Sequence, residues 1–150
     1  MPIEIGWLVE GRVSYYNYTG NITVEEIQEA SRIGLMLLEQ SAGSLMHTIQ
    51  DNRQMDKFPR EFPVLIKSVR ESLQHPQMGW MLSVGIQEDI IRFVATLVSK
   101  VTRTRHRVFT TYEEAITFLN SVDSELPDLA AYTIPSEDRI MYRVSAPANT

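Results

Sequence analysis

Apolar residues recur along the chain with two periods, and the segments that they mark alternate between strand and helix. Residues 78–84 are almost all apolar, which is typical of a strand covered on both faces of a sheet. Residues 87–101 repeat their apolar positions at helical spacing, and a short strand at 107–109 and a helix at 111–122 follow. This order of strand, helix, strand and helix predicts parallel strands joined by right-handed crossovers.

The first half of the chain predicts a hairpin and two more helices. Residues 5–9 and 12–19 have the character of paired antiparallel strands. A helix begins at Thr23, with Glu26 at the spacing of a capping box. Gly34 on its apolar face lowers helix propensity and indicates a close approach of helix to sheet. The elements that follow are a strand at 44–50, a polar loop at 51–60 and an amphipathic helix at 62–73.

These elements predict one α/β domain at residues 1–122, with a mixed, mainly parallel sheet of about five strands and four helices. A chain of 150 residues has the length of a single domain. Residues 123–150 differ because prolines interrupt them, and only 139–144 has the character of a strand. We expect this C-terminal extension to dock on the domain or on a partner subunit.

Composition and charge exclude several classes of function. The chain has 14 basic and 19 acidic residues and a net charge of −5, which disfavours binding to nucleic acid or to an anionic bilayer. The absence of cysteine excludes disulfides, thiolate metal sites and cysteine nucleophiles. No segment has the ~20 apolar residues of a membrane span, and no secretory signal is visible. We therefore expect a cytoplasmic protein without integral membrane contact.

The residues that often carry catalysis or metal binding lack the spacing that those functions need. His47, His75 and His106 form no metal-ligand motif, and the seven glycines form no phosphate-binding loop. Ser83 lacks the glycine two positions before it that a nucleophile elbow requires, and we interpret it as a small residue within a buried strand. We expect no catalytic residue, no metal and no cofactor.

A polar site is predicted where the strands end. In open α/β sheets, ligands gather beyond the carboxyl ends of the strands, close to helix N-termini. These residues could line a small polar pocket for an anionic or lipid-like molecule. The alternative is that they cap helices and solvate loops, as Asp, Asn and Thr commonly do. The candidate ligand-binding residues are Asp51, Asn52, Arg53, Gln54, Gly85, Gln87, Thr110 and Thr111.

Apolar residues outside the main helix faces predict a surface for a partner. They are Ile33 and Met36 on one helix and Ile91 and Val98 on another. An exposed apolar patch usually marks an interface, so we expect a protein partner, and a homodimer formed by helix packing is the simplest one. The alternative is that residues 123–150 cover these side chains.

Several local motifs resemble those of a known domain family. They are Tyr18-Thr19-Gly20 before the first helix, the strand ending at Asp51, residues 79–85 (GWMLSVG) before a helix, and residues 107–110 (RVFT) followed by Glu113-Glu114-Ala115 and Phe118-Leu119. With the order of elements over residues 5–122, they resemble the STAS-type domain of anti-sigma-factor antagonists, in particular the diverged bacterial SpoIIAA-like group. That resemblance implies a module that binds protein partners, nucleotides or lipids.

One functional motif of that family is absent. Its phospho-switch members carry an Asp-Ser-Ser-Gly-like run at the start of the second helix, where this chain reads Asp51-Asn52-Arg53-Gln54-Met55. Without the serine, the phosphorylation switch does not carry over. We expect a non-catalytic regulatory or protein-interaction module, or alternatively a carrier that binds its small ligand near residues 51–54.

Overall fold

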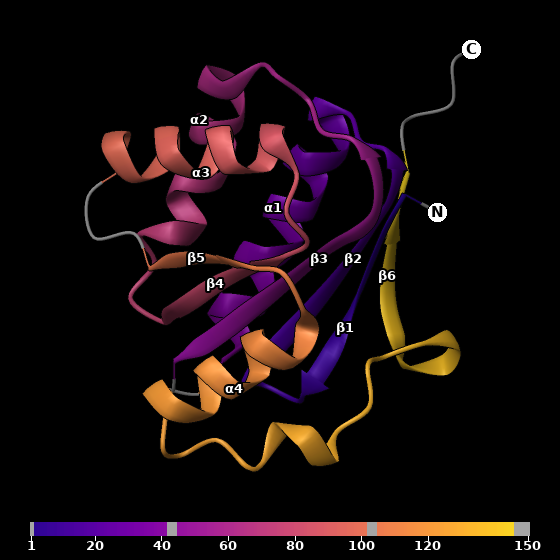
Figure 1. The fold of residues 1–150 in the computed structure, drawn as a ribbon, viewed down its shortest axis with the longest axis vertical. Coiled ribbons are helices and arrows are strands. Elements are labelled where there is room, and N and C mark those ends of the chain that lie inside the picture. The colour runs from indigo at the N-terminus through magenta and orange to yellow at the C-terminus, as the bar shows by residue number, and fades with distance from the viewer. Residues whose placement is uncertain (1, 42–44, 102–104, 146–150) are drawn as a thin grey trace.

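The computed structural model describes residues 2–41, 45–101 and 105–145. Within these ranges the chain forms six strands, four α-helices and two short 3-10 helices (Figure 1). The strands are β1 (Ile3–Val9), β2 (Val13–Asn21), β3 (Met46–Lys57), β4 (Met78–Val84), β5 (His106–Phe109) and β6 (Ile140–Val144). The α-helices are α1 (Val24–Gln40), α2 (Phe62–Leu73), α3 (Glu88–Lys100) and α4 (Tyr112–Val122), and the 3-10 helices are η1 (Leu129–Ala131) and η2 (Glu137–Arg139).

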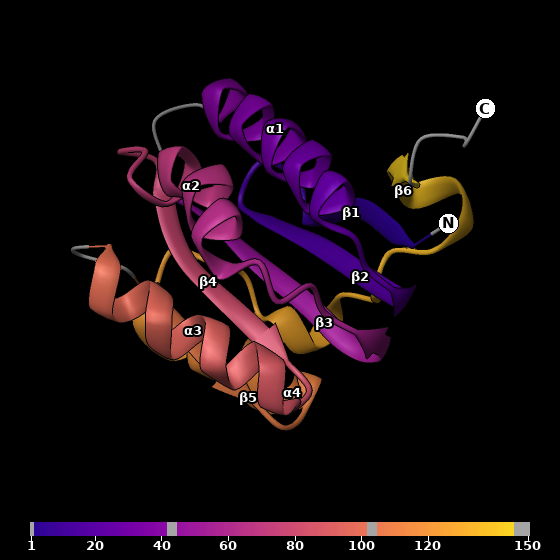
Figure 2. The same ribbon diagram turned by 90° about the horizontal axis from the view of Figure 1, so that it is seen from above.

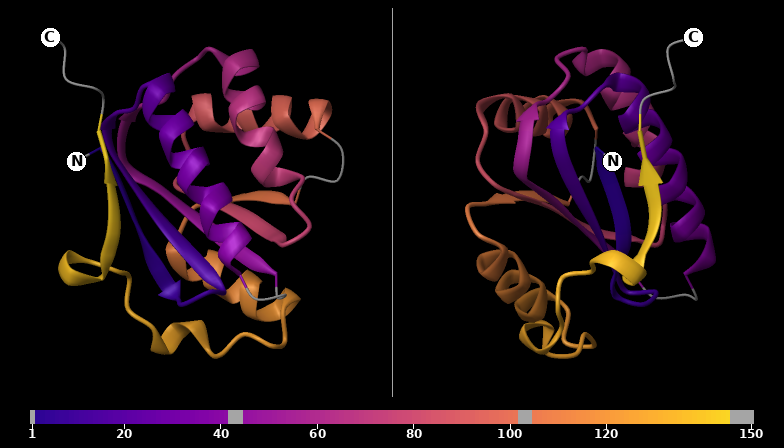
Figure 3. Two further views of the ribbon diagram at one scale, coloured as in Figure 1. Left: turned by 180° about the vertical axis from the view of Figure 1, so that it is seen from behind. Right: turned by 90° about the vertical axis from the view of Figure 1, so that its right-hand side faces the viewer.

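The strands form one mixed sheet in the order β5-β4-β3-β2-β1-β6. Neighbours from β2 to β5 are parallel, whereas β1 is antiparallel to both β2 and β6. This architecture confirms the predicted α/β class with a mainly parallel sheet. The sheet has six strands, one more than expected, because β6 from the C-terminal extension pairs with the free edge of β1 (Figure 3).

The two faces of the sheet carry separate apolar cores. Helices α1, α2 and α3 cover one face, and α4 with η1 covers the other (Figure 2). The first core has Ile3, Ile5, Leu65 and Leu97 among its buried members, and the second has Leu8, Ile49, Leu82, Leu119 and Leu129. Successive side chains of a strand point to opposite faces of the sheet, so neighbouring strand residues belong to different cores.

The N-terminal cap of helix α1 and the contact at its glycine are as the sequence predicts. Thr23 Oγ1 accepts a hydrogen bond from the Glu26 amide at 3.2 Å, and the Glu26 carboxylate accepts one from the Thr23 amide at 2.8 Å. A Cβ at Gly34 would lie 2.8 Å from the Tyr16 hydroxyl oxygen. The glycine therefore allows the close approach of helix to sheet that the sequence predicts.

One expectation about local structure is wrong. The polar segment from Asp51 onward is not a loop, because β3 continues to Lys57. The backbone of β3 pairs with that of β2 as far as Asn21 and Lys57, with two register shifts. Because this pairing uses backbone groups, it does not require apolar side chains. The chain leaves the sheet only near Phe58.

The expected apolar surface is also smaller than predicted. Ile33 is only 4% exposed and belongs to the first core, and Met36 packs partly against that core, because α1 contacts both α2 and β6. Ile91 and Val98 on α3 are 45% and 53% exposed, as expected. In the described residues, no helix is both long enough and apolar enough to cross a bilayer.

Candidate functional site: a cavity between the sheet and three helices

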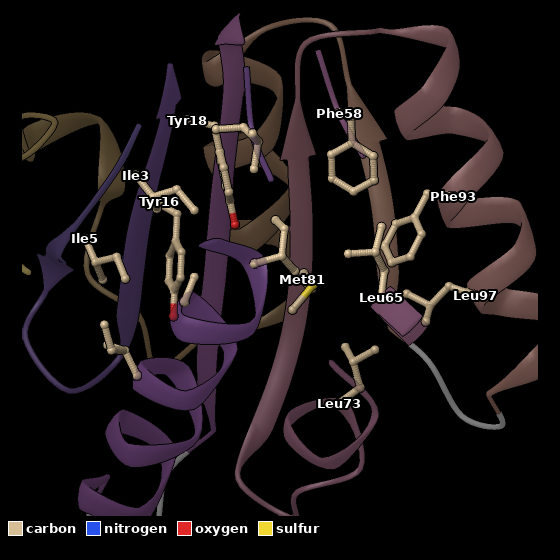
Figure 4. Packing of buried hydrophobic residues seen from close by; sticks show 14 of the residues in the cluster. Ile3, Ile5, Tyr16, Tyr18, Phe58, Leu65, Leu73, Met81, Phe93 and Leu97 are labelled. Carbon is tan, nitrogen blue, oxygen red and sulfur yellow. The ribbon is translucent and has the colours of Figure 1, made fainter. Parts of the chain in front are cut away.

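A cavity of about 60 Å³ lies in the first core, between the sheet and helices α1, α2 and α3. All three helices contribute to its walls, which are apolar except for Ser31 of α1 and Ser72 of α2. Val69 of α2 and Val94 of α3 line it and are only partly buried. Figure 4 shows the surrounding side chains, among them Tyr16, Tyr18, Phe58, Phe93 and Leu97.

The sheet side of the cavity carries several polar side chains among apolar ones, which is unusual for a sheet face covered by helices. Thr48, Gln50 and Asn52 occupy successive inward positions on β3, the third strand from one edge of the sheet. Ser83 of β4 and His106 of β5 lie beside them. We call these five residues the polar stripe.

Some members of the polar stripe are satisfied by protein partners. The hydroxyls of Thr48 and Ser14 are 3.0 Å apart. Ser83 Oγ and His106 Nε2 are 2.9 Å apart, so one donates to the other according to the imidazole tautomer. Burial lowers the pKa of His106 to about 4, so its imidazole is neutral at physiological pH.

Two atoms of the stripe have no hydrogen-bond partner among the described residues. They are Nδ2 of Asn52 and Nδ1 of His106, and both atoms are buried. Asn52 as a whole is only 3% exposed. A buried polar group without a partner costs about 1–3 kcal/mol, so such groups point to a missing water or ligand.

The Ser83 and His106 pair does not form a hydrolytic triad within the described part of the chain. A triad needs an acid on the second imidazole nitrogen to orient the ring. Nδ1 of His106 meets no carboxylate among the described residues. The geometry supports the interpretation of Ser83 as a small buried strand residue that hydrogen-bonds its neighbour.

A second polar cluster lies on the opposite face of the sheet. The Tyr15 hydroxyl donates to Asp51, and Arg53 donates from Nε at 2.9 Å and from Nη2 at 2.8 Å to the same carboxylate. Burial raises the pKa of Asp51, but the hydrogen bonds from Arg53 and Tyr15 outweigh it and lower that pKa below its ordinary value. Burial, and then the Asp51 hydrogen bond, raise the pKa of Tyr15.

This cluster lines a surface pocket of about 380 Å³ beside the C-terminal extension. Other polar side chains around it are Glu4, Asn17 and Arg143. The Asp51 carboxylate already accepts four hydrogen bonds from Tyr15 and Arg53, the fourth from the Arg53 amide at 3.1 Å. Arg53 thus gives two of its guanidinium nitrogens to Asp51, although its side chain is 42% exposed.

A third cluster joins α4 to the opposite end of the sheet. His47 Nδ1 accepts from the Trp80 amide at 2.9 Å, so Nε2 carries the proton and donates to Asp123 at 2.9 Å. Burial lowers the pKa of His47, although Asp123 acts in the opposite direction. Arg12 adds an ion pair to Asp123 at 3.4 Å. In the parts of the chain that the structure describes, no three His, Asp or Glu side chains could hold a metal ion.

The residues of the predicted polar pocket do not come together in one pocket. Asp51, Arg53 and Gln54 line the surface pocket, whereas Asn52 faces the internal cavity. Gln87 donates to the carbonyls of Asn52 and Met55. Gly85 turns the chain with a φ of 101° beside Arg53, Thr111 caps α4, and Thr110 is exposed. Strand alternation sends Asn52 to the side opposite Asp51 and Arg53. A register shift in the pairing of β2 with β3 falls between Asp51 and Gln54, and Gln54 lines the same pocket as Arg53.

The sequence interpretation missed most of the polar stripe. Thr48, Gln50 and Asn52 give no period-2 signal in the sequence, because among the residues next to them only Ile49 is apolar. The meeting of Ser83 and His106 was not visible, because it depends on the pairing of β4 with β5.

Comparison with known proteins gives no assignment. The chain matches no model of a protein family, and no curated protein sequence matches it.

Proposed function

We propose that this protein is a non-catalytic module of STAS-like architecture that binds a small lipid-like molecule in the cavity between the sheet and helices α1, α2 and α3. The polar stripe carries the proposal. Concave sites with apolar walls and a few convergent polar groups are the usual form of small-molecule sites. The walls would bury an apolar body, and the stripe would orient its polar groups.

The cavity at about 60 Å³ holds only a few water molecules as it stands. A larger ligand needs this space to widen, for example by separation of α2 from α3. Phe62 and Phe93 join these helices with ring centroids 5.6 Å apart, and Phe58 packs on Phe93 at 5.3 Å. These aromatic contacts lie beside the cavity and would change when it fills.

Native mass spectrometry of protein purified from its own host tests this proposal. We expect a bound molecule that is lost in Ala30→Leu, because Ala30 is buried and lines the cavity. Ala95→Leu is the matched control, since Ala95 is exposed on α3. An empty protein, together with no thermal shift from a panel of lipids and nucleotides, would remove support for the proposal.

The second candidate is a protein-interaction module that acts through α3, as a homodimer or with another protein. Ile91 and Val98 are exposed two helical turns apart, and Ile86 near the start of α3 is 57% exposed. The double variant Ile91→Glu and Val98→Glu should abolish self-association in sedimentation velocity, and Ser99→Glu on the same helix should not. A monomeric parent protein at every concentration would end the homodimer form of this candidate.

A further inference from the structure

The cavity has a composition that constrains the charge of what it can hold. None of the described residues that line it is Asp, Glu, Lys or Arg. His106, the one titratable imidazole among them, is neutral at physiological pH. A buried ion without a partner is far more costly than a buried dipole with one, so the lining disfavours a carboxylate, a phosphate or an ammonium group.

The polar atoms are also spread along the cavity. Thr48 and Asn52 are four residues apart on one strand, which corresponds to about 13 Å. His106 is two strands away from β3, because β4 lies between them. The unpartnered Asn52 Nδ2 is a donor, and the neutral imidazole of His106 offers either a donor or an acceptor at Nδ1.

We infer that the cavity selects uncharged lipid-like molecules whose hydroxyl, ester or amide groups hydrogen-bond to Asn52 and to other members of the polar stripe. This inference rests on the proposed ligand-binding function and narrows its ligand class. It replaces the anionic ligand expected near residues 51–54, where Asp51 and Arg53 neutralise each other. Ordered water alone could also satisfy Asn52 and His106, and the experiment separates that outcome.

A matched series of six-carbon ligands tests the inference: hexanol, hexanamide, hexanoate, hexylammonium and hexane. Binding is followed at neutral pH by NMR titration of the full chain. We expect hexanol and hexanamide to bind at least about tenfold more tightly than either ion, because only the ions leave an unpaired buried charge. Asn52→Leu should weaken the binding of hexanamide about fivefold, which corresponds to the loss of roughly one hydrogen bond. The affinity for hexane should stay unchanged.

Gln54→Leu is the control variant, since Gln54 lies on the same strand but lines the surface pocket. Melting curves of both variants confirm that they fold, and His106→Phe provides a second probe of the stripe. Hexanoate binding as tightly as hexanamide, or equal effects of the Asn52 and Gln54 variants, would overturn the inference while leaving ligand binding intact. Binding of no member, with water alone in the cavity, would instead remove the proposed function itself.

Discussion

Gly79 lies against the buried side chain of His47, and the absence of a side chain at position 79 leaves room for the imidazole ring. A Cβ at position 79 would lie 2.4 Å from His47 Nδ1, well inside van der Waals contact. Both residues are in strands of the sheet interior, so neither backbone can shift freely. We expect Gly79→Ala to lower the free energy of unfolding by about 1–3 kcal/mol, measured by urea denaturation.

A double-variant cycle identifies the cause of that loss. His47→Ala removes the ring that the new methyl group would strike, so Gly79→Ala should be less destabilising in that background. If the alanine costs the same with and without the ring, the clash with His47 is not the reason for glycine at this position.

His106 predicts a pH dependence of stability. Its pKa is about 4 in the folded protein, against an ordinary value of 6.5. The unfolded chain therefore binds more protons between these two values, and stability falls as the pH drops from 6.5 toward 4. His106→Gln should reduce this fall without removing it, because burial also lowers the pKa of His47.

Urea denaturation at about pH 7 and about pH 4.5 measures the effect. His75 serves as the control, since His75→Gln removes a histidine that lies outside the cavity lining. An unchanged pH slope in His106→Gln would show that the imidazole titrates in the folded protein much as it does in the unfolded chain.

At the scale of elements, the start of α1 depends on a reciprocal cap. Thr23→Ala leaves an amide at the first turn without its acceptor. We expect the free energy of unfolding to fall by about 1 kcal/mol. Thr110→Ala should change it little, because Thr110 is exposed. Equal changes in the two variants would argue against the cap as the source of the effect.

The helices were the elements that the sequence predicted best. Each repeats apolar residues at helical spacing, and α1 and α4 begin at threonines whose side chains accept hydrogen bonds from Glu26 and Glu114. These signals lie within each helix and its first turn, so they do not depend on contacts with the rest of the chain. The extent of β3 was not predictable in the same way, because its polar second half is held by pairing with β2.

At the scale of the molecule, residues 123–145 belong to the same folded unit as the rest. Leu126, Leu129 and Val144 are buried, and β6 completes one edge of the sheet. A chain that ends at Val122 should lose on the order of 5 kcal/mol from these side chains alone. Thermal unfolding of that chain, compared with one that ends at Ser145, measures the loss.

Similar melting temperatures for the two chains would contradict this expectation. We therefore expect a chain shortened to Val122 to be too disrupted to report on self-association, so it cannot test the second candidate function. Substitutions on α3 are therefore the cleaner test of a dimer, since they leave the core unchanged.

The sequence by itself determined the class of the fold, because the periods of apolar residues fix which segments are helices and which are strands. It also determined the absence of thiol chemistry and the overall negative charge. The tertiary structure decided which side chains meet. Strand parity sends Asp51 to one face and Asn52 to the other, and strand pairing brings Ser83 to His106. An uncharged cavity depends on such long-range placement, which no local pattern encodes.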